Sequence, residues 1–267
     1  MSIRYGKPPI TEAIFDLRVT ARPNASAAEI ASGFTGIESE YPHRQELPTD
    51  AGIKISFGPG GMPPQVSGGP VLGGFRYESA DHGRIFQARR DGFVFSLVPV
   101  EGRLYDSWDA FCDQVRPLWE QYRAAWEPVK VVRAALRYVN HLSFSGPEVN
   151  LPDHFALFPG APREDVLPSP ELAAYSMQVV LPQGDIGATA VINTATVPSP
   201  PAPDGAITVV LDIDLYRERL AWDPADDATL WNAMGQLRVR KNELFRSCIK
   251  EATEKLLEPL ETQEPTR

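Results

Sequence analysis

Three basic side chains recur on one face of a predicted strand, and they are the first candidates for chemistry. Residues 131–144 alternate in polarity, so Arg133, Arg137 and His141 point to the same face of an extended segment. Successive members lie about 13 Å apart by strand rise, too far for a single small anion. This spacing suits a groove for an extended acidic ligand or peptide.

Glu12 is the acidic partner that we expect on this face. A second alternating segment near the N-terminus places Glu12 and Asp16 together. If the two segments are neighbouring strands, Glu12 and Arg137 can form a bidentate ion pair that fixes the floor of the groove. Arg133 and His141 would then be free to meet a partner. The alternative is a solvated or helix-covered strand whose arginines pair with Glu12 or Asp16.

Other polar residues offer less specific chemistry. Asn140 falls on the apolar face of residues 131–144, where its amide either caps the structure or contacts a ligand. Asp212 and Asp214 share a strand face about 7 Å apart, which suits acid–base chemistry, a metal site or a plain polar surface. The four histidines are scattered and lack metal-ligand spacing, so we predict no metal site. We also predict no cofactor and assign no catalytic residue.

Charge and cysteine usage limit the class of protein. A net charge of −9 disfavours nucleic acid as a partner. No apolar run approaches the ~20 residues of a membrane span, and the N-terminus has no signal-peptide pattern. Cys112 and Cys248 lie on apolar helical stripes and read as buried thiols of a reducing compartment. We therefore expect a cytoplasmic protein without membrane contact.

Two amphipathic helices and a series of strands must position these groups. Residues 106–126 and 226–257 repeat apolar side chains at intervals of three and four. Lys241 interrupts the apolar stripe of the second helix, which is locally basic and could form an anion groove with the Arg133 strand or a solvated face. Alternating segments predict strands at 10–19, 75–79, 84–90, 93–98, 131–144, 172–181, 187–196 and 206–216.

The order of these elements predicts an α+β fold of two related halves. Each half is expected to be an antiparallel β-meander sheet packed against a long helix, with an ancient duplication behind the similarity. We place the halves at 1–149 and 150–267, joined by a proline-rich linker at about 150–170 within one compact unit. The glycine-rich segment 58–74 has no phosphate-loop spacing and is read as a surface loop.

Four short motifs resemble one family. They are KPPITEAIFDLR at 7–18, Phe95 followed by DSWDAF at 106–111, RAALRYVN at 133–140 and KNELFRSCI at 241–249. The family they resemble is a sporadically distributed, uncharacterised prokaryotic set of about 250 residues, with an N-terminal P-P-x-x-E strand and a central R-Y-x-N strand. Many members carry a histidine on the last helix, and this chain lacks one at 236–241, which weakens any shared catalytic role there. Patchy distribution implies defence or mobile-element neighbourhoods.

Two functions follow as hypotheses. The first is a non-catalytic binding or adaptor protein that uses a sheet groove for a peptide, a protein partner or a small ligand, with Glu12, Arg133, Arg137, Asn140 and His141 as binding residues. The second is an enzyme with a site between the halves, built from Glu12, Arg137, His141 and an aspartate. The absence of a recognisable catalytic motif favours the first.

Overall fold

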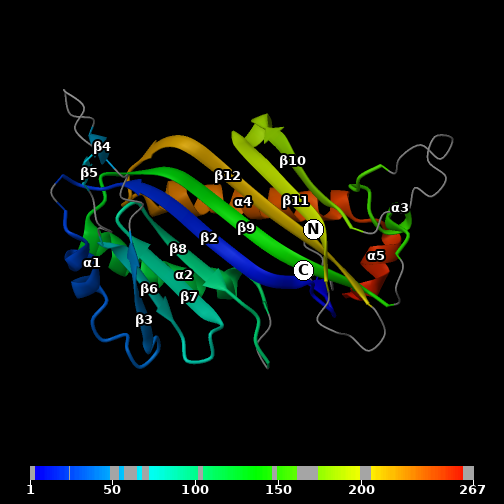
Figure 1. Cartoon of the computed structure of the whole chain (residues 1–267), viewed down its shortest axis with the longest axis horizontal. Helices are drawn as coiled ribbons and strands as arrows, with labels where there is room; N and C mark the ends of the chain where they lie inside the picture. Colours follow the sequence, from blue (N-terminus) through cyan, green and yellow to red (C-terminus); the bar gives the residue numbers. More distant parts are fainter. Residues whose placement is uncertain are drawn as a thin grey trace, which may run out of the picture.

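One large antiparallel sheet dominates the computed structural model (Figure 1). The structure describes residues 4–23, 25–48, 54–56, 65–67, 72–101, 105–145, 149–160, 174–198 and 206–260. The sheet has nine strands, each antiparallel to its neighbours, in the order β10 (Ser176–Gln183), β11 (Ala188–Pro198), β12 (Ile207–Trp222), β9 (Lys130–Phe144), β2 (Ile10–Thr20), β8 (Gly92–Leu97), β7 (Arg84–Arg89), β6 (Leu72–Glu78) and β3 (His43–Pro48). This confirms an α+β architecture with an antiparallel sheet.

Two long helices cover one face of this sheet, which we call the inner face. They are α2 (Trp108–Trp126) and α4 (Asp227–Cys248), which lie behind the strands in Figure 1. The opposite face carries no helix of the described chain, and we call it the outer face. Smaller elements complete the fold: α1 (Ala27–Gly33), α3 (Leu151–His154), α5 (Glu251–Leu256), the 3-10 turn η1 (Gly184–Ile186), and the two-stranded pairs β1 (Arg4–Tyr5) with β13 (Pro259–Leu260) and β4 (Lys54–Ser56) with β5 (Gln65–Ser67).

The helix α2 forms on the predicted apolar stripe and continues through Pro117, where the proline favours a boundary or a kink. Ser107 caps it, because the serine side chain accepts a hydrogen bond from the backbone N–H of Ala110. Trp119, Tyr122 and Trp126 are fully buried on its sheet-facing stripe. Tyr122 Oη and Trp126 Nε1 donate to backbone carbonyls of the β7–β8 turn, so the polar ends of both rings are satisfied.

The prediction of one continuous helix over residues 226–257 is wrong, because the segment forms two helices. It divides into α4 and α5 at Ile249, whose backbone is extended (φ −106°, ψ 160°) and bridges to Phe155. Backbone N–H groups of Ala156 and Lys250 complete this crossing by bonding to Cys248 and His154. The break is therefore set by a tertiary contact with the segment after α3, and no glycine or proline marks it.

The strands of both predicted halves share one sheet. The sequence predicts a sheet for each half, whereas β2 and β9 pair at the centre and join the two sets of strands. The same order occurs twice along the chain, from β2 to α2 and from β9 to α4: a strand, a three-strand meander whose last strand pairs with that first strand, and a long helix. Most of the glycine-rich segment 58–74 lies outside the described residues.

Candidate functional site

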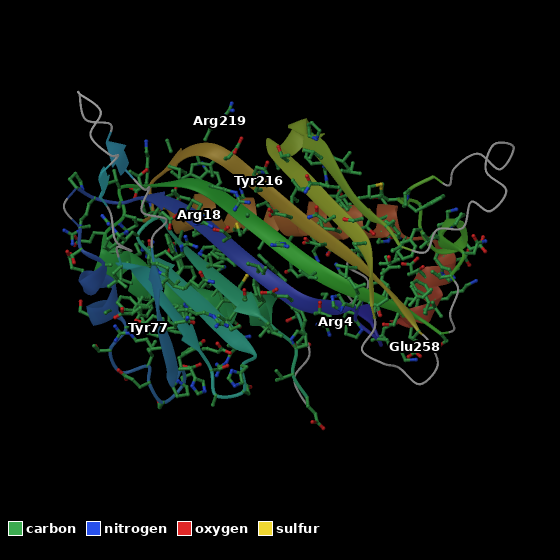
Figure 2. All side chains as sticks on the ribbon, viewed as in Figure 1. Arg4, Arg18, Tyr77, Tyr216, Arg219 and Glu258 are labelled. Atoms are coloured by element: carbon green, nitrogen blue, oxygen red, sulfur yellow. The ribbon has the colours of Figure 1, made fainter. Side chains whose placement is uncertain are left out.

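Most of the predicted site residues lie on the outer face of the sheet. Strand alternation sends every second side chain of β9, β2 and β12 to this face, which is turned toward the viewer in Figure 2, where Arg18 and Tyr216 are labelled. The alternate side chains, which include Phe15, Leu136 and Ile213, are completely buried against the helices. A charged network occupies the middle of the outer face.

Arg137 is held by Asp212 in a bidentate pair. Its Nε and Nη2 each lie 2.8 Å from a carboxylate oxygen of Asp212. The side chain of Arg137 is 47% exposed, whereas that of Asp212 is 8% exposed. The hydrogen bonds to Asp212 keep the pKa of Arg137 above its ordinary value. The guanidinium is thus fixed in direction while its Nη1 side faces away from the pair.

A chain of side-chain amides continues this pair to the edge of the sheet, and we call it the amide relay. Asn193 on β11 donates through Nδ2 to Asp212 Oδ2 at 3.1 Å. Gln178 on β10 donates through Nε2 to Asn193 Oδ1 at 2.7 Å. The amide relay therefore links Gln178, Asn193, Asp212 and Arg137 across four adjacent strands.

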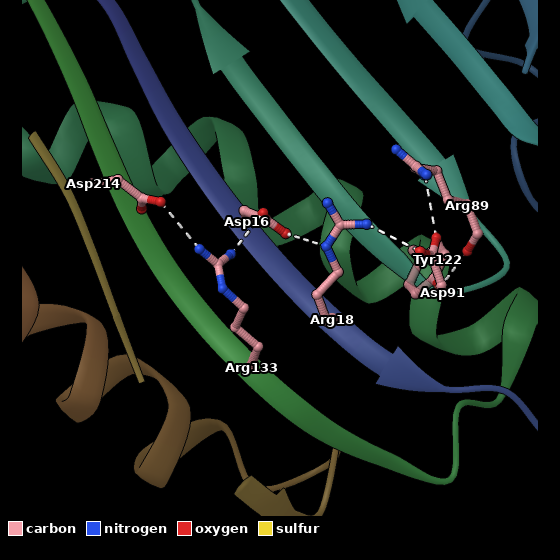
Figure 3. A network of polar contacts seen from close by, with 7 residues as sticks. All are labelled: Asp16, Arg18, Arg89, Asp91, Tyr122, Arg133 and Asp214. Carbon is pink, nitrogen blue, oxygen red and sulfur yellow. Dashed lines mark hydrogen bonds and ion pairs between the residues drawn. The ribbon is translucent and has the colours of Figure 1, made fainter. Parts of the chain in front are cut away.

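Arg133 stands between two aspartates (Figure 3). Its Nη1 lies 2.8 Å from Asp16 Oδ2 and its Nη2 lies 3.2 Å from Asp214 Oδ2. The guanidinium also lies over the ring of Tyr216, 4.7 Å from the centroid. Burial raises the pKa of Asp214, and Arg133 opposes that rise.

The network continues from Asp16 toward α2. Asp16 also pairs with Arg18, and Arg18 and Arg89 both contact Asp91 in the β7–β8 turn (Figure 3). Tyr122 of α2 donates to the Arg89 carbonyl at 2.7 Å, which connects this turn to the helix layer. Two or more partners hold most of these charges, and the network forms a continuous charged floor across β12, β9, β2 and the β7–β8 turn.

The predicted pair between Glu12 and Arg137 is wrong in its acidic partner. Glu12 and Asp212 both stand opposite Val139, one on each flanking strand, so both are diagonal neighbours of Arg137. The register of β2 against β9 shifts between Ile10 and Glu12, whereas β12 runs in regular register past Asp212. The strand in regular register, β12, therefore provides the bidentate partner of Arg137, which is Asp212.

The remaining predicted site residues divide between the two faces. Arg133 is held by two carboxylates, so the expectation that it is free is also wrong. His141 is exposed on the outer face, one alternation beyond Val139. Asn140 is only 3% exposed on the inner side, where its Nδ2 donates to the Leu211 carbonyl at 2.9 Å. Asn140 therefore has a structural partner in the strand pair β9–β12.

The basic side chains of the last helix do not join the Arg133 strand in one groove. The helix α4 packs on the inner face, and Arg133 stands on the outer face. Lys241 is 8% exposed, with Nζ 3.7 Å from the ring centroid of Tyr138. Arg240 pairs instead with Asp185 of η1. The two faces separate these charges, so of the two alternatives for this helix the anion groove with the Arg133 strand does not form.

Comparison with protein-family models, with curated proteins and with solved structures finds no match for this chain. The resemblance to an uncharacterised prokaryotic family therefore stays a prediction. No helix in the described part of the chain has the length and apolar character that a membrane span requires. Among the described residues, no group of three or more His, Cys, Asp or Glu side chains is placed to hold a metal ion.

Sequence reasoning identified the strand that carries the site and, as one alternative, the pairing of its arginines with Asp16, but it missed the partners on β12 and the amides. Asp212 and Asp214 are two residues apart, which places them on one face of their strand, but the sequence does not show which strand pairs with it. Asn193 and Tyr216 carried no recognisable signal. The enzyme hypothesis built on Glu12, Arg137, His141 and an aspartate stays a hypothesis. Asp212, the carboxylate that contacts Arg137, is held in its ion pair.

Proposed function

We propose that the protein is a non-catalytic binding or adaptor protein that holds an extended, carboxylate-bearing segment of a protein partner on the outer face. The observation that carries this proposal is Arg137, which is fixed by Asp212 through Nε and Nη2 and is still 47% exposed. A planar guanidinium held in this way can offer its remaining N–H groups to a second carboxylate. Because the side chain is already ordered, the ligand does not have to supply that ordering entropy.

The direction of β9 suits an extended ligand. Arg137 and His141 are four residues apart on one face of the strand, which is about 13 Å. An extended peptide laid along β9 advances at a similar rise, so side chains four residues apart in the peptide would meet both groups. The charged floor around Asp16 and Arg133 would sit beside the same segment and would select against a purely apolar partner.

The test compares an outer-face variant with a matched variant on the helix side. Arg137→Lys combined with His141→Ala keeps a charge beside Asp212 and removes the guanidinium and the imidazole. Arg246→Ala is the control, because Arg246 lies on α4 with a similar exposure of 53%. A partner captured by the wild-type chain is identified, and its binding segment is made as a synthetic peptide, with and without its carboxylates.

Calorimetry of that peptide should show at least about tenfold weaker binding to the outer-face variant, which corresponds to about 1.4 kcal/mol. Removal of the peptide carboxylates should weaken binding to the wild type and have little further effect on the variant. The control should bind like the wild type. Equal affinity of the wild type and the outer-face variant, with both folded, would show that the partner binds elsewhere.

We also infer an ancient duplication with its repeat boundary between α2 and β9. Two features support it: the repeated order of strand, meander and long helix, and the central pairing of the two first strands, β2 and β9. The boundary predicted at residues 149 and 150 follows β9, whereas this topology makes β9 the first strand of the second repeat. Expression of residues 130–260 alone tests the idea, since a repeat with its own core should retain helical circular dichroism.

We further propose a cytoplasmic location. The thiols of Cys112 and Cys248 are both unpaired and buried, which suits a reducing compartment. Burial raises the pKa of Cys112 to about 12 and that of Cys248 to about 11, so neither is a reactive thiolate at neutral pH. A role in defence or mobile-element neighbourhoods follows from the family resemblance alone and stays an expectation.

A further inference from the structure

The two edges of the sheet differ in how they are protected. The edge strand β3 carries Arg44 and Glu46 and ends in Pro48, which are features that keep an exposed edge from pairing with other strands. The other edge strand, β10, has the sequence SMQVVLPQ and no charged residue. Among the described strands it pairs with β11 alone. Pro182 is the one such feature in β10 and lies near the end of the strand, so residues 176–181 form an edge with little protection.

The backbone groups that face this open edge can be assigned. Just before β10, the Tyr175 carbonyl accepts from the backbone N–H of Thr196 at 3.1 Å, and the Tyr175 N–H donates to the Thr196 hydroxyl at 3.1 Å. Tyr175 therefore faces β11, and alternation sends the backbone of Gln178 and Val180 outward. Pro182 has the same parity and no N–H, as expected for a position that faces away from the ladder.

The side chains of β10 are incompletely covered on both faces of the sheet. Val180 is a large apolar residue on the outer side with 54% exposure. On the inner side Met177, Val179 and Leu181 are each partly exposed, because α4 packs mainly on β12 and β9. This strand lacks the charge that would repel another strand, and no helix in the described part of the chain covers it.

We propose that β10 pairs antiparallel with β10 of a second copy of this chain, so that two sheets become one continuous sheet in a twofold dimer. The register that fits best is centred on Val179. In this register Met177 meets Leu181 of the copy and Val179 meets its own counterpart, so the inner-side pairs formed within β10 are apolar, and Gln183 lies beyond them opposite Tyr175. Gln178 meets Val180 of the copy in hydrogen-bonded pairs.

The proline determines which registers are available. Centred on Val179, the pairing uses every outward N–H of Ser176, Gln178 and Val180 and makes about six interchain hydrogen bonds. A register centred on Val180 would place Gln178 opposite Pro182, which cannot donate, and Met177 opposite the polar Gln183. The second copy is favoured as occupant because β10 has no charge to repel itself, although the whole chain carries −9.

The first experiment measures oligomeric state by light scattering across the micromolar range. The wild-type chain should be a dimer, and Val180→Lys should be a monomer with an unchanged circular dichroism spectrum. Gln45→Lys is the matched control, because it places the same charge on the outer side of the other edge strand and should leave the dimer intact. A monomeric wild type, or a dimer that persists in Val180→Lys, would overturn the proposal.

The second experiment tests the register by cross-linking. Val179→Cys places two thiols directly opposite each other in a non-hydrogen-bonded pair, with Cα atoms about 4.5 Å apart, which is within the range for a disulfide. Mild oxidation should give a covalent dimer of this variant. Val180→Cys faces Gln178 of the copy and should cross-link at least about tenfold more slowly, while the native thiols stay buried. Equal cross-linking of the two variants would refute this register.

Discussion

Replacing Lys241 by methionine should stabilise the fold near neutral pH and remove part of its pH dependence. Lys241 lies on the sheet-facing stripe of α4, with Leu237 and Leu244 on the same stripe. Only 8% of it is exposed. Its Nζ contacts the ring face of Tyr138, and no carboxylate of the described chain pairs with it. Burial, and secondly Arg238, lower the pKa of Lys241 from 10.5 to about 7.

The sign follows from proton binding in the two states. In the folded protein Lys241 loses its proton near pH 7, whereas an unfolded lysine keeps it until about pH 10.4. The unfolded state binds more protons in this window, so the free energy of unfolding rises with pH. Between about pH 7 and pH 8.5 the rise should be about 1 to 2 kcal/mol, since one proton per molecule limits the slope to about 1.4 kcal/mol per pH unit.

The gain from methionine at pH 7 has two opposing parts. Lowering the lysine pKa by about three and a half pH units corresponds to about 5 kcal/mol of destabilisation. Methionine in turn loses the contact of the lysine side chain with the ring of Tyr138, which offsets up to about 2 kcal/mol of this gain. Methionine has a similar length and needs no desolvation of charge, so Lys241→Met should gain about 3 kcal/mol.

The assay is chemical denaturation at several pH values between about 7 and 8.5. This range ends below the region where Cys112 and Cys248 act in the opposite direction: their pKa values are raised on folding, so they reduce stability as pH rises above about 9. Lys255→Met is the control, because Lys255 has 71% side-chain exposure. If the wild type and Lys241→Met show the same pH slope, the amine is hydrated in solution and the burial argument fails.

Three further substitutions test the packing and the charged network by denaturation. Trp119→Ala removes a fully buried ring and should cost about 3–5 kcal/mol. Arg137→Ala leaves Asp212 buried without its cation and should cost about 2 kcal/mol, most of which Asp212→Asn should restore in the double variant. Arg133→Ala should also destabilise, since two aspartates lose their shared cation, whereas Arg246→Ala should change the midpoint little.

Alternation and helical periodicity were enough to predict the central strands, the long helix α2 and the face on which the residues of β9 lie. The strand pattern at 131–144 placed Tyr138 in the core and Arg137 on the opposite surface, and the stripe of residues 106–126 matched the buried face of α2. These are local properties, because a period of 2 or 3.6 residues is fixed by the backbone. The dipeptide Asp91-Gly92 is a common hairpin signal, and it lies at the turn between β7 and β8, where Gly92 begins β8 and pairs with Arg89.

Partners across strands were not predictable from the same pattern. Arg137 has an acidic diagonal neighbour on each side, Glu12 on β2 and Asp212 on β12, and both are equally compatible with its alternation. Which one pairs depends on strand order and on the irregular register near Ile10, and these are tertiary properties. The end of α4 at Ile249 has the same origin, since a bridge to Phe155 stops a segment that could otherwise continue as helix.

The proposed dimer would place two copies of the proposed binding face side by side, so that one partner could bind both. The amide relay runs from Arg137 to Gln178 at the edge, so pairing of β10 would place two such relays end to end on one continuous face. The two Arg137 side chains would be separated by seven strand spacings, or about 34 Å. A partner with two carboxylate-bearing segments would need about ten extended residues between them to reach both. Such a partner would gain avidity from the dimer, and Val180→Lys would remove that gain without changing the affinity of a single segment.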